Sequence, residues 1–424
     1  MNVKFYVFLF LLCGNLFSYP LWLHTSRTQI TNTKGEVVLL YGVNFGSWLL
    51  NELWMTDFQP RGSNLTCDVD IRNILNKRFG KKKAKQLLDI YQQSYINEQD
   101  FDNVKKLGFN CIRVPFFYKI LEDDDNPGVY KKCGWDLLDF AVSNCAARNI
   151  YCIIDLHGTP GGQSADHTTG QTGLNKLFWE KKFQDRTVEM WKAIAQRYKN
   201  ESAVAGYDLI NEPYGTPTKE SLLKLYARLY KAIRAIDKKH IIFLADRGPW
   251  HGGLNEFPVL KKGRHPIPAT ISNMPGTRLD LVAGIGEWEN VVYQTHLYNF
   301  KEWGVKAHKK LIDDFANEEI AKRKNVPILI GEFHPWGDNK VWELYFTKFN
   351  SNNWNWTLWT YKCSSKAGDW GIYRTSVTPN ILKDSFNELS NKFTRYSTEF
   401  ATTDKKQIDV LKSGARLSII KQNH

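Results

Sequence analysis

The chain has 424 residues but only 7 cysteines and 4 methionines, and several common functional motifs are missing from it. It contains no P-loop, no zinc-finger spacing and no RNA-binding signature, which argues against nucleotide and nucleic-acid partners. No GxGxxG follows an apolar run, which argues against a dinucleotide-binding fold. HExxH, HxH and CxxC pairs are also absent, so we expect neither a metal nor a cofactor.

Long hydrophobic runs are absent beyond the N-terminus. There, Lys4 precedes an almost wholly apolar stretch over residues 5–17, followed by Ser18-Tyr19-Pro20. A basic start and a short apolar core are typical of a secretory signal peptide, so residues 1–19 predict a secreted, extracellular protein, with cell-wall association as one option. An uncleaved anchor stays open. We expect no other membrane contact, because no later segment reaches the length of a transmembrane helix.

Positive charge is in excess, yet it is not concentrated. Lys and Arg number 57 against 44 Asp and Glu, a net charge of +13. The densest basic run, residues 81–83, lies in a helix-like polar context and reads as a solvent-exposed face. This composition favours a soluble protein, which we expect to be a monomer.

Cysteine usage leaves the redox state open. Cys13 would leave with the signal peptide, and the six remaining cysteines permit up to three disulfides in a secreted chain. Cys111 and Cys152, however, lie within apolar strand-like runs, where free core thiols are also common.

Apolar strand-like and charged helix-like segments alternate along most of the chain. The strand-like segments begin near residues 37, 110, 151, 205, 241, 291, 327 and 355. Eight such units predict an α/β fold, a single-domain (β/α)8 TIM barrel, rather than an open sheet. We place the catalytic domain at residues 20–390 and a polar C-terminal tail at residues 391–424.

Two of the predicted strands end in a glutamate. AGYDLINEPYG places Glu212 after one apolar run, and VPILIGEFHPW places Glu332 after another. Strand ends of a parallel barrel meet at one rim, so the two carboxylates should face one cleft. Hydrolysis of a glycosidic bond with retention needs this pair, one as general acid and then base, the other as nucleophile. We therefore interpret Glu212 as the acid/base and Glu332 as the nucleophile.

Further polar and aromatic side chains are predicted at the same rim. They are Arg113, His157, Asn211, His296, Tyr298 and Trp359. Arg113 and Tyr298 would hold Glu332 ionised and oriented, and the charge of Glu332 would raise the pKa of Glu212. Asn211 would bind the sugar 2-hydroxyl, the two histidines would bind sugar hydroxyls or Glu212, and Trp359 would form the floor under the sugar.

These residues and their flanking motifs resemble glycoside hydrolase family 5. The NEP triplet at Asn211 and the GE pair at Glu332 carry the resemblance, which runs from about residue 41 to residue 373. YGVNFGSWLLNELWM and IDLHGTPGGQS are similar to the exo-β-1,3-glucanase branch of that family. The resemblance implies a (β/α)8 barrel, a retaining two-Glu mechanism without metal, and a β-glucan or other β-linked oligo- or polysaccharide as substrate.

The subgroup is left open by departures from that branch, at Ser47, Leu53 and residues 333–335. The alternatives are an endo-β-1,4-glucanase, a β-glucosidase acting on small or lipid-linked glucosides, and a transglycosylase. A non-catalytic sugar-binding barrel is a more distant alternative, because a binding protein has no need for two acids at close range. The loops at residues 158–173 and 251–288 are expected to set the linkage and the exo or endo preference.

Overall fold

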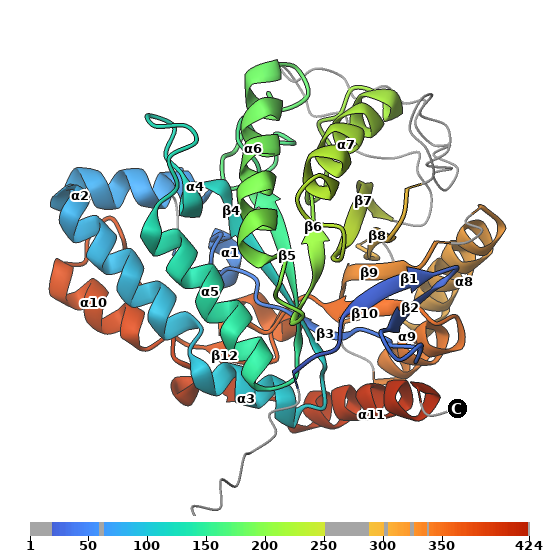
Figure 1. Cartoon of the computed structure of the whole chain (residues 1–424). Coiled ribbons are helices and arrows are strands. Elements are labelled where there is room, and N and C mark those ends of the chain that lie inside the picture. Colours follow the sequence, from blue (N-terminus) through green and yellow to red (C-terminus); the bar gives the residue numbers. More distant parts are fainter. Residues whose placement is uncertain are drawn as a thin grey trace, which may run out of the picture.

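A closed barrel of eight parallel strands forms the centre of the computed structural model, which describes residues 19–58, 63–250, 288–300, 304–322, 326–336 and 339–422 (Figure 1). The barrel strands are β3 (Tyr41–Asn44), β4 (Cys111–Phe117), β5 (Tyr151–Gly158), β6 (Val204–Asp208), β7 (Ile241–Trp250), β8 (Val291–Leu297), β9 (Ile328–Phe333) and β10 (Asn355–Leu358). β10 closes the barrel by pairing with β3, where Trp356 lies opposite Tyr41. The predicted (β/α)8 barrel is thereby confirmed.

Alternation along the strands separates an inner core from an outer one. Cys111, Ile153 and Leu329 pack together inside the barrel, whereas Ile112 and Ile330, their neighbours in sequence, pack with the surrounding helices. An inward strand position therefore continues, two residues further on, into the interior of the upper barrel. This periodicity brings polar side chains of several strands to one place.

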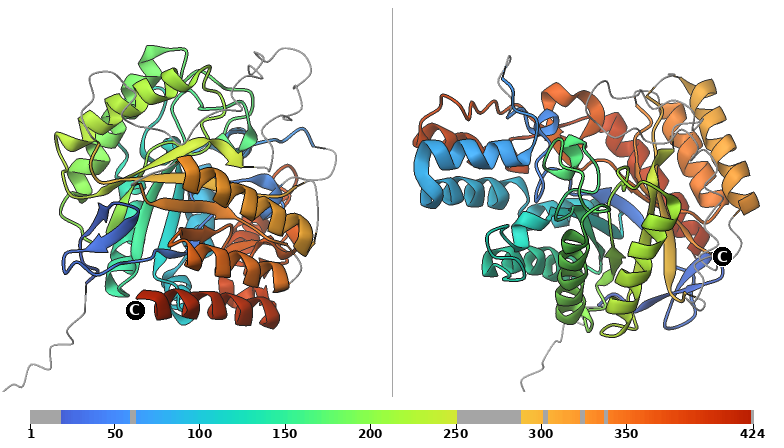
Figure 2. Two further views of the ribbon diagram at one scale, coloured as in Figure 1. Left: turned by 90° about the vertical axis from the view of Figure 1, so that its right-hand side faces the viewer. Right: turned by 90° about the horizontal axis from the view of Figure 1, so that it is seen from above.

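Helices surround the barrel. They are α1 (Leu53–Thr56), α2 (Asp68–Tyr95), α3 (Glu98–Lys106), α4 (Tyr118–Leu121), α5 (Lys132–Ala147), α6 (Lys181–Tyr198), α7 (Lys219–Arg234), α8 (Val305–Lys322), α9 (Asn339–Ser351), α10 (Phe386–Thr394) and α11 (Lys405–Gln422). Figure 2 shows them around the barrel from two further sides. The short 3-10 helices are η1 (His167–Thr169), η3 (Ser365–Trp370) and η4 (Thr398–Phe400).

Two small sheets lie outside the barrel. An N-terminal hairpin of β1 (Leu23–Ser26) and β2 (Gln29–Asn32) packs near β7, and β11 (Lys362–Ser364), β12 (Tyr373–Thr375) and β13 (Thr402–Thr403) form a second sheet. The buried Lys362 of β11 donates to the carbonyl oxygens of Tyr95 and Tyr396. This side chain ties the segment after β10 to α2 and to the segment after α10.

The C-terminal segment, expected as a polar tail, is largely helical and packed. α10 lies beside α2, and α11 lies beside α9 at the lower side of the molecule (Figures 1 and 2). Leu411 of α11 is fully buried, and the hydroxyl of Ser418 donates to Oδ1 of Asn350 at 2.9 Å. The polar face of α11 accounts for the sequence pattern, and its buried face joins the helix to the outer core.

The six cysteines of the described residues are all free thiols, so none of the permitted disulfides is formed. Five are buried and Cys133 is partly buried. Across the described parts of the chain, no helix has the length and apolar character needed to cross a bilayer. The predicted signal segment up to residue 18 and the loop 251–287 lie outside the described residues.

Candidate active site

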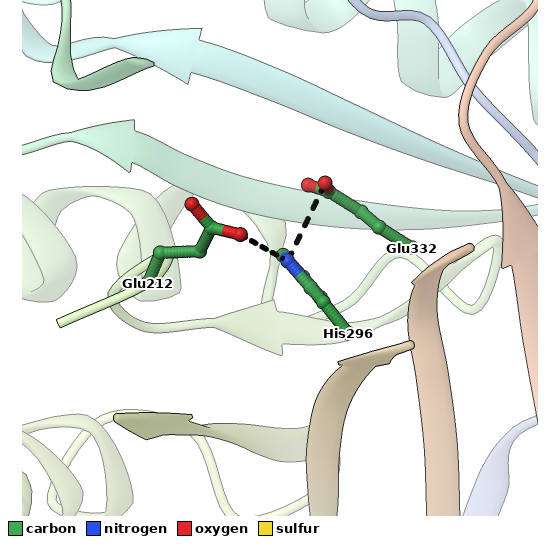
Figure 3. A group of neighbouring side chains, drawn as sticks. All are labelled: Glu212, His296 and Glu332. Carbon is green, nitrogen blue, oxygen red and sulfur yellow. Dashed lines mark hydrogen bonds and ion pairs between the residues drawn. The ribbon is translucent and has the colours of Figure 1, made fainter. Parts of the chain in front are cut away.

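The two glutamates lie on either side of one histidine. Nδ1 of His296 is 2.7 Å from Oε1 of Glu212 and 3.4 Å from Oε2 of Glu332 (Figure 3). One oxygen of each carboxylate and a ring nitrogen of His296 all lie within 4.8 Å of one another. Two carboxylates predicted from strand ends 120 residues apart in sequence therefore share one cleft.

Each glutamate is placed by its strand. Glu332 is the fifth residue of β9, one before its last residue, whereas Glu212 lies in the loop four residues beyond the end of β6. The backbone of Glu212 has φ of +39°, in the left-handed region that non-glycine residues rarely adopt. Such a conformation at a polar cleft residue is a feature of functional sites, where the surrounding fold holds the strained backbone.

Arg113 lies at the centre of the site, although we expected it at the end of its strand. β4 continues four residues beyond Arg113, whose side chain is fully buried inside the barrel. Its guanidinium donates from Nη1 to Glu332 at 2.9 Å and from Nε to Asp208 at 2.8 Å, and Nη2 lies 3.0 Å from Asp155. The predicted pairing of Arg113 with Glu332 is present, and two further acids share the same cation.

A second layer joins Arg113 to the aromatic floor. Nη2 of Arg113 donates to Oδ1 of Asn211 at 2.8 Å, and the amide nitrogen of Asn211 lies 3.2 Å from Nε2 of His157. Nδ1 of His157 is 2.7 Å from Asp155, and its ring stacks on Trp359 with centroids 5.4 Å apart. His157 thus has a protein partner at both ring nitrogens, so it acts on Asn211 and Trp359 within the protein.

Tyr298 and His296 come from the end of β8 and reach the glutamates directly. The Tyr298 hydroxyl donates to Oε2 of Glu332 at 3.0 Å. His296 contacts Glu212, the second of the two roles expected for it. Behind the ring, Nε2 of His296 lies 2.8 Å from the amide nitrogen of Gln294.

Burial dominates the ionisation of both acids. Burial raises the pKa of Glu212 to about 8, and the negative charges of Asp166 and Glu52 add to the rise while His157 and Arg113 oppose it. The charge of Glu332, which we expected to be the main cause, is not among the largest contributions to that shift. Burial also raises the pKa of Glu332, against His296 and Arg113, which both lower it.

Several polar residues of the site were missed by sequence reasoning. Asp155 and Asp208 sit on inward strand positions, and each has one buried carboxylate oxygen without a hydrogen-bond partner among the described residues. Glu52 accepts a hydrogen bond from Nε1 of Trp54 and lies 3.5 Å from His167. The period-2 pattern of β5 signals Asp155, which precedes His157 by two residues; Glu52 comes from a loop and carries no such signal.

Glu212, His296 and Glu332 also have the atoms of a small metal site. The donor set of two carboxylates and one imidazole suits a divalent cation. Here, however, a guanidinium already supplies positive charge to Glu332, and Glu212 retains its proton up to about pH 8. These residues fit proton transfer and nucleophilic attack better than they fit a cation.

Comparisons with known proteins agree with the geometry. The chain is 29% identical over 395 residues to a β-xylosidase from Phanerodontia chrysosporium, covering 86% of this chain and 75% of that protein. It is 27% identical over 317 residues to a probable glucan 1,3-β-glucosidase A from Aspergillus clavatus, covering 71% and 66% of the two chains. A solved rutinosidase from Aspergillus niger has the same fold, with a TM-score of 0.57 at 16% identity over 77% of this chain and 90% of that one. Residues 77–365 match the model of the family described as cellulase (glycosyl hydrolase family 5), and the chain is a glycoside hydrolase that belongs to this family.

Proposed function

We propose that the chain is a retaining β-glycosidase that cleaves β-glucan, in the manner of a glucan 1,3-β-glucosidase, with Glu212 as acid/base and Glu332 as nucleophile. The observation that carries the proposal is the closeness of the two carboxylates, whose oxygens lie within 4.8 Å of each other and of His296. Carboxyl groups of retaining enzymes are about 5–5.5 Å apart, whereas inverting enzymes leave roughly 6.5–9.5 Å for a water molecule.

In the first step, Glu332 attacks the anomeric carbon while Glu212 gives its proton to the leaving oxygen. Arg113 and Tyr298 hold the attacking carboxylate from two sides, at 2.9 and 3.0 Å, and so orient its free lone pairs. Because burial keeps the proton on Glu212 near neutral pH, the acid is loaded before the bond breaks. In the second step, Glu212 takes a proton from water, which releases the sugar from Glu332.

The remaining residues bind and position the sugar. Trp359 offers an aromatic face beside His157, which suits the C–H face of a pyranose ring. Arg113 and His157 engage the amide of Asn211 from both ends, so its second N–H is held in place for the 2-hydroxyl. This mechanism uses no metal and no cofactor.

A second candidate is a β-xylosidase, which the relative from Phanerodontia chrysosporium favours because it matches 86% of this chain. The two activities share the same two-Glu chemistry and differ in the sugar that the site accepts. An endo-β-1,4-glucanase, a glucosidase for small or lipid-linked glucosides and a transglycosylase differ in the same way.

A time course of products separates these candidates. The purified chain without residues 1–19 is incubated with laminarin, carboxymethyl-cellulose, mannan and xylo-oligosaccharides. Glucose alone from laminarin at the earliest points supports the glucan 1,3-β-glucosidase, and xylose alone from xylo-oligosaccharides supports the β-xylosidase. Mixed oligosaccharides from either polymer contradict both exo activities, and no turnover of any β-linked substrate contradicts the proposed function. Secretion, a monomeric state and wall association remain predictions from the N-terminal segment and the composition.

A further inference from the structure

Gln294 lies directly behind the histidine that contacts both glutamates. It sits on β8, two residues before His296, and its side chain is fully buried. Its amide nitrogen lies 2.8 Å from Nε2 of His296, on the side of the ring opposite Glu212 and Glu332. Gln294 therefore touches the ring without touching either acid.

The fold makes specific room for this amide. A Cβ on Gly331, the residue before the nucleophile, would lie 2.1 Å from Nε2 of Gln294 and 2.9 Å from its Cγ. Glycine at that position lets the Gln294 side chain pass between β9 and the ring of His296. The carbonyl of Gly331 is held by Asn44 and Thr357, at 2.9 and 2.6 Å, so β9 cannot shift away from the amide.

The direction of the hydrogen bond decides the state of the imidazole. The amide nitrogen of Gln294 is a donor only, so Nε2 of His296 must accept and carries no proton. The ring proton is then on Nδ1, where it is donated to Glu212 at 2.7 Å and faces Glu332 at 3.4 Å. A second ring proton on Nε2 would point into the amide N–H, so this contact disfavours the imidazolium form.

We propose, on the basis of the proposed function, that Gln294 is a positioning residue for the acid–base step: it keeps His296 neutral with its proton on Nδ1, so that the catalytic proton stays on Glu212. Without the amide, a histidine between two carboxylates would gain a proton, because nearby negative charge favours the cation. The imidazolium would then lower the proton affinity of Glu212 and deprive the leaving group of its acid.

The charges around His296 come from several strands. They are Glu332 on β9 and Asp155 on β5, which favour the imidazolium, Arg113 on β4 and His157 on β5, which oppose it, and Glu212 in contact with Nδ1. Burial is the largest contribution, and the pKa of His296 is lowered to about 4. A neutral ring is consistent with the donor contact from Gln294.

The opposite orientation of the amide makes a different prediction. It would place the amide oxygen on Nε2, move the ring proton there, and turn Nδ1 into an acceptor for the proton of Glu212. In the orientation of the structure, Oε1 of Gln294 is buried without a partner among the described residues. A turned amide would instead leave both its hydrogens without an acceptor, and buried orphan N–H groups are rarer than under-satisfied carbonyl oxygens.

Three variants test the proposal. Gln294→Met removes the donor at similar volume, and Gln294→Glu replaces it with a carboxyl that accepts from Nε2. Thr295→Val is the matched control, because its neighbouring hydroxyl is buried on the same strand and makes no hydrogen bond within the described structure. Glu212→Ala reports separately on the proposed function.

The kinetic readout compares leaving groups on aryl and alkyl β-glycosides of whichever sugar the wild-type chain cleaves. In both Gln294 variants, kcat/KM for a poor leaving group should fall about 10- to 100-fold, within the range that general acid catalysis contributes. For a 2,4-dinitrophenyl glycoside, which needs no acid, the loss should stay below about 3-fold. The upper pH limb should move to lower pH, further for Gln294→Glu, and Thr295→Val should match the wild type.

The spectroscopic readout is independent of turnover. Long-range ¹H–¹⁵N spectra of the histidine rings, with His296 assigned through His296→Asn, should show a neutral ring protonated at Nδ1 between about pH 5 and 8 in the wild type. Gln294→Glu should show protons on both ring nitrogens. A wild-type ring protonated at Nε2, or unchanged rings and leaving-group dependence in both Gln294 variants, would overturn the proposal. If Glu212→Ala itself shows no leaving-group dependence, the proposed function fails, and the spectra still decide the state of His296.

Discussion

Nη1 of Arg113 lies 2.9 Å from Oε1 of Glu332, and the Arg113 side chain is completely buried. The same guanidinium also contacts Asp155 and Asp208, so one cation serves three acids inside the barrel. These acids raise the pKa of Arg113 further, which keeps it charged at every working pH. The nucleophile is thus tied to the interior of the barrel as well as to its rim.

Replacing Arg113 should affect both stability and the pH profile. Arg113→Met leaves three buried acids without their cation, and removing one partner of a buried ion pair costs about 3–5 kcal/mol. The pKa of Glu332 should rise further, so the lower limb of the kcat/KM profile should move to higher pH. Denaturant unfolding and pH–rate profiles measure the two effects. Arg197→Met is the control: its pair with Asp139 is exposed, so a loss below about 1 kcal/mol is expected. Equal losses for both variants would contradict the central role of Arg113.

Removing the charge of Glu332 should stop turnover while leaving sugar binding intact. Glu332→Gln keeps the shape and the hydrogen bond from Tyr298, but an amide cannot form the covalent intermediate. We expect no measurable kcat and a dissociation constant for product within about 3-fold of wild type by calorimetry, a change of less than about 0.7 kcal/mol. Glu343→Gln, on the exposed face of α9, is the control for expression and handling. Substantial turnover by Glu332→Gln would remove it from the role of nucleophile.

Glu212→Ala should separate the acid role from the base role. Substrates with poor leaving groups should lose about 10²–10⁴-fold in kcat, the contribution of general acid–base catalysis. Activated substrates should still form the intermediate and stall there, because no base activates water. Added azide should restore turnover and give a glycosyl azide of retained configuration, detected by NMR. An azide product of inverted configuration would show that the sugar was never held on Glu332.

The sequence anticipated the barrel and the two acids because both follow from strand periodicity. Eight apolar runs with helices between them predict a closed parallel barrel, and a glutamate at the end of such a run lies at the rim. The contacts of Arg113 with Asp155 and Asp208 depend on the barrel closing at one register, which no local pattern specifies. Gln294 was missed for the same reason: within VVYQTHLY it is an ordinary polar residue, and only the approach of Gly331 gives it a place.

The electrostatics of Glu212 were predicted in direction but not in cause. A raised pKa was expected from the charge of Glu332, whereas burial contributes most and Asp166 and Glu52 add to it. Glu52 comes from the loop after β3 and Asp166 from the long loop after β5. Loop conformations that bring distant segments together cannot be read from periodicity, so their charges were absent from the prediction.

The C-terminal helix should contribute measurably to stability. Leu411 of α11 is fully buried, whereas Leu417 on the same helix is 42% exposed. Leu411→Ala should lower the free energy of unfolding by about 2–5 kcal/mol, as expected for a buried leucine, while Leu417→Ala should change it by less than about 1 kcal/mol. Urea unfolding followed by Trp fluorescence measures both. Equal values for the two variants would mean that α11 behaves as a loose tail.

The charge of Asp166 and Glu52 should set the upper pH limit of activity. Glu212 must be protonated to act as an acid, so kcat/KM should fall as pH rises through its pKa of about 8. Asp166→Asn and Glu52→Gln each remove a negative charge that raises this pKa, so each should move the upper limb to lower pH, and the double variant should move it further. Glu189→Gln, an exposed acid paired with Lys192 on α6, should leave the limb in place. Because salt screens exposed charges more than buried ones, the shifts should persist at about 0.5 M NaCl. A limb that stays fixed in both single variants would mean that burial alone determines the proton affinity of Glu212.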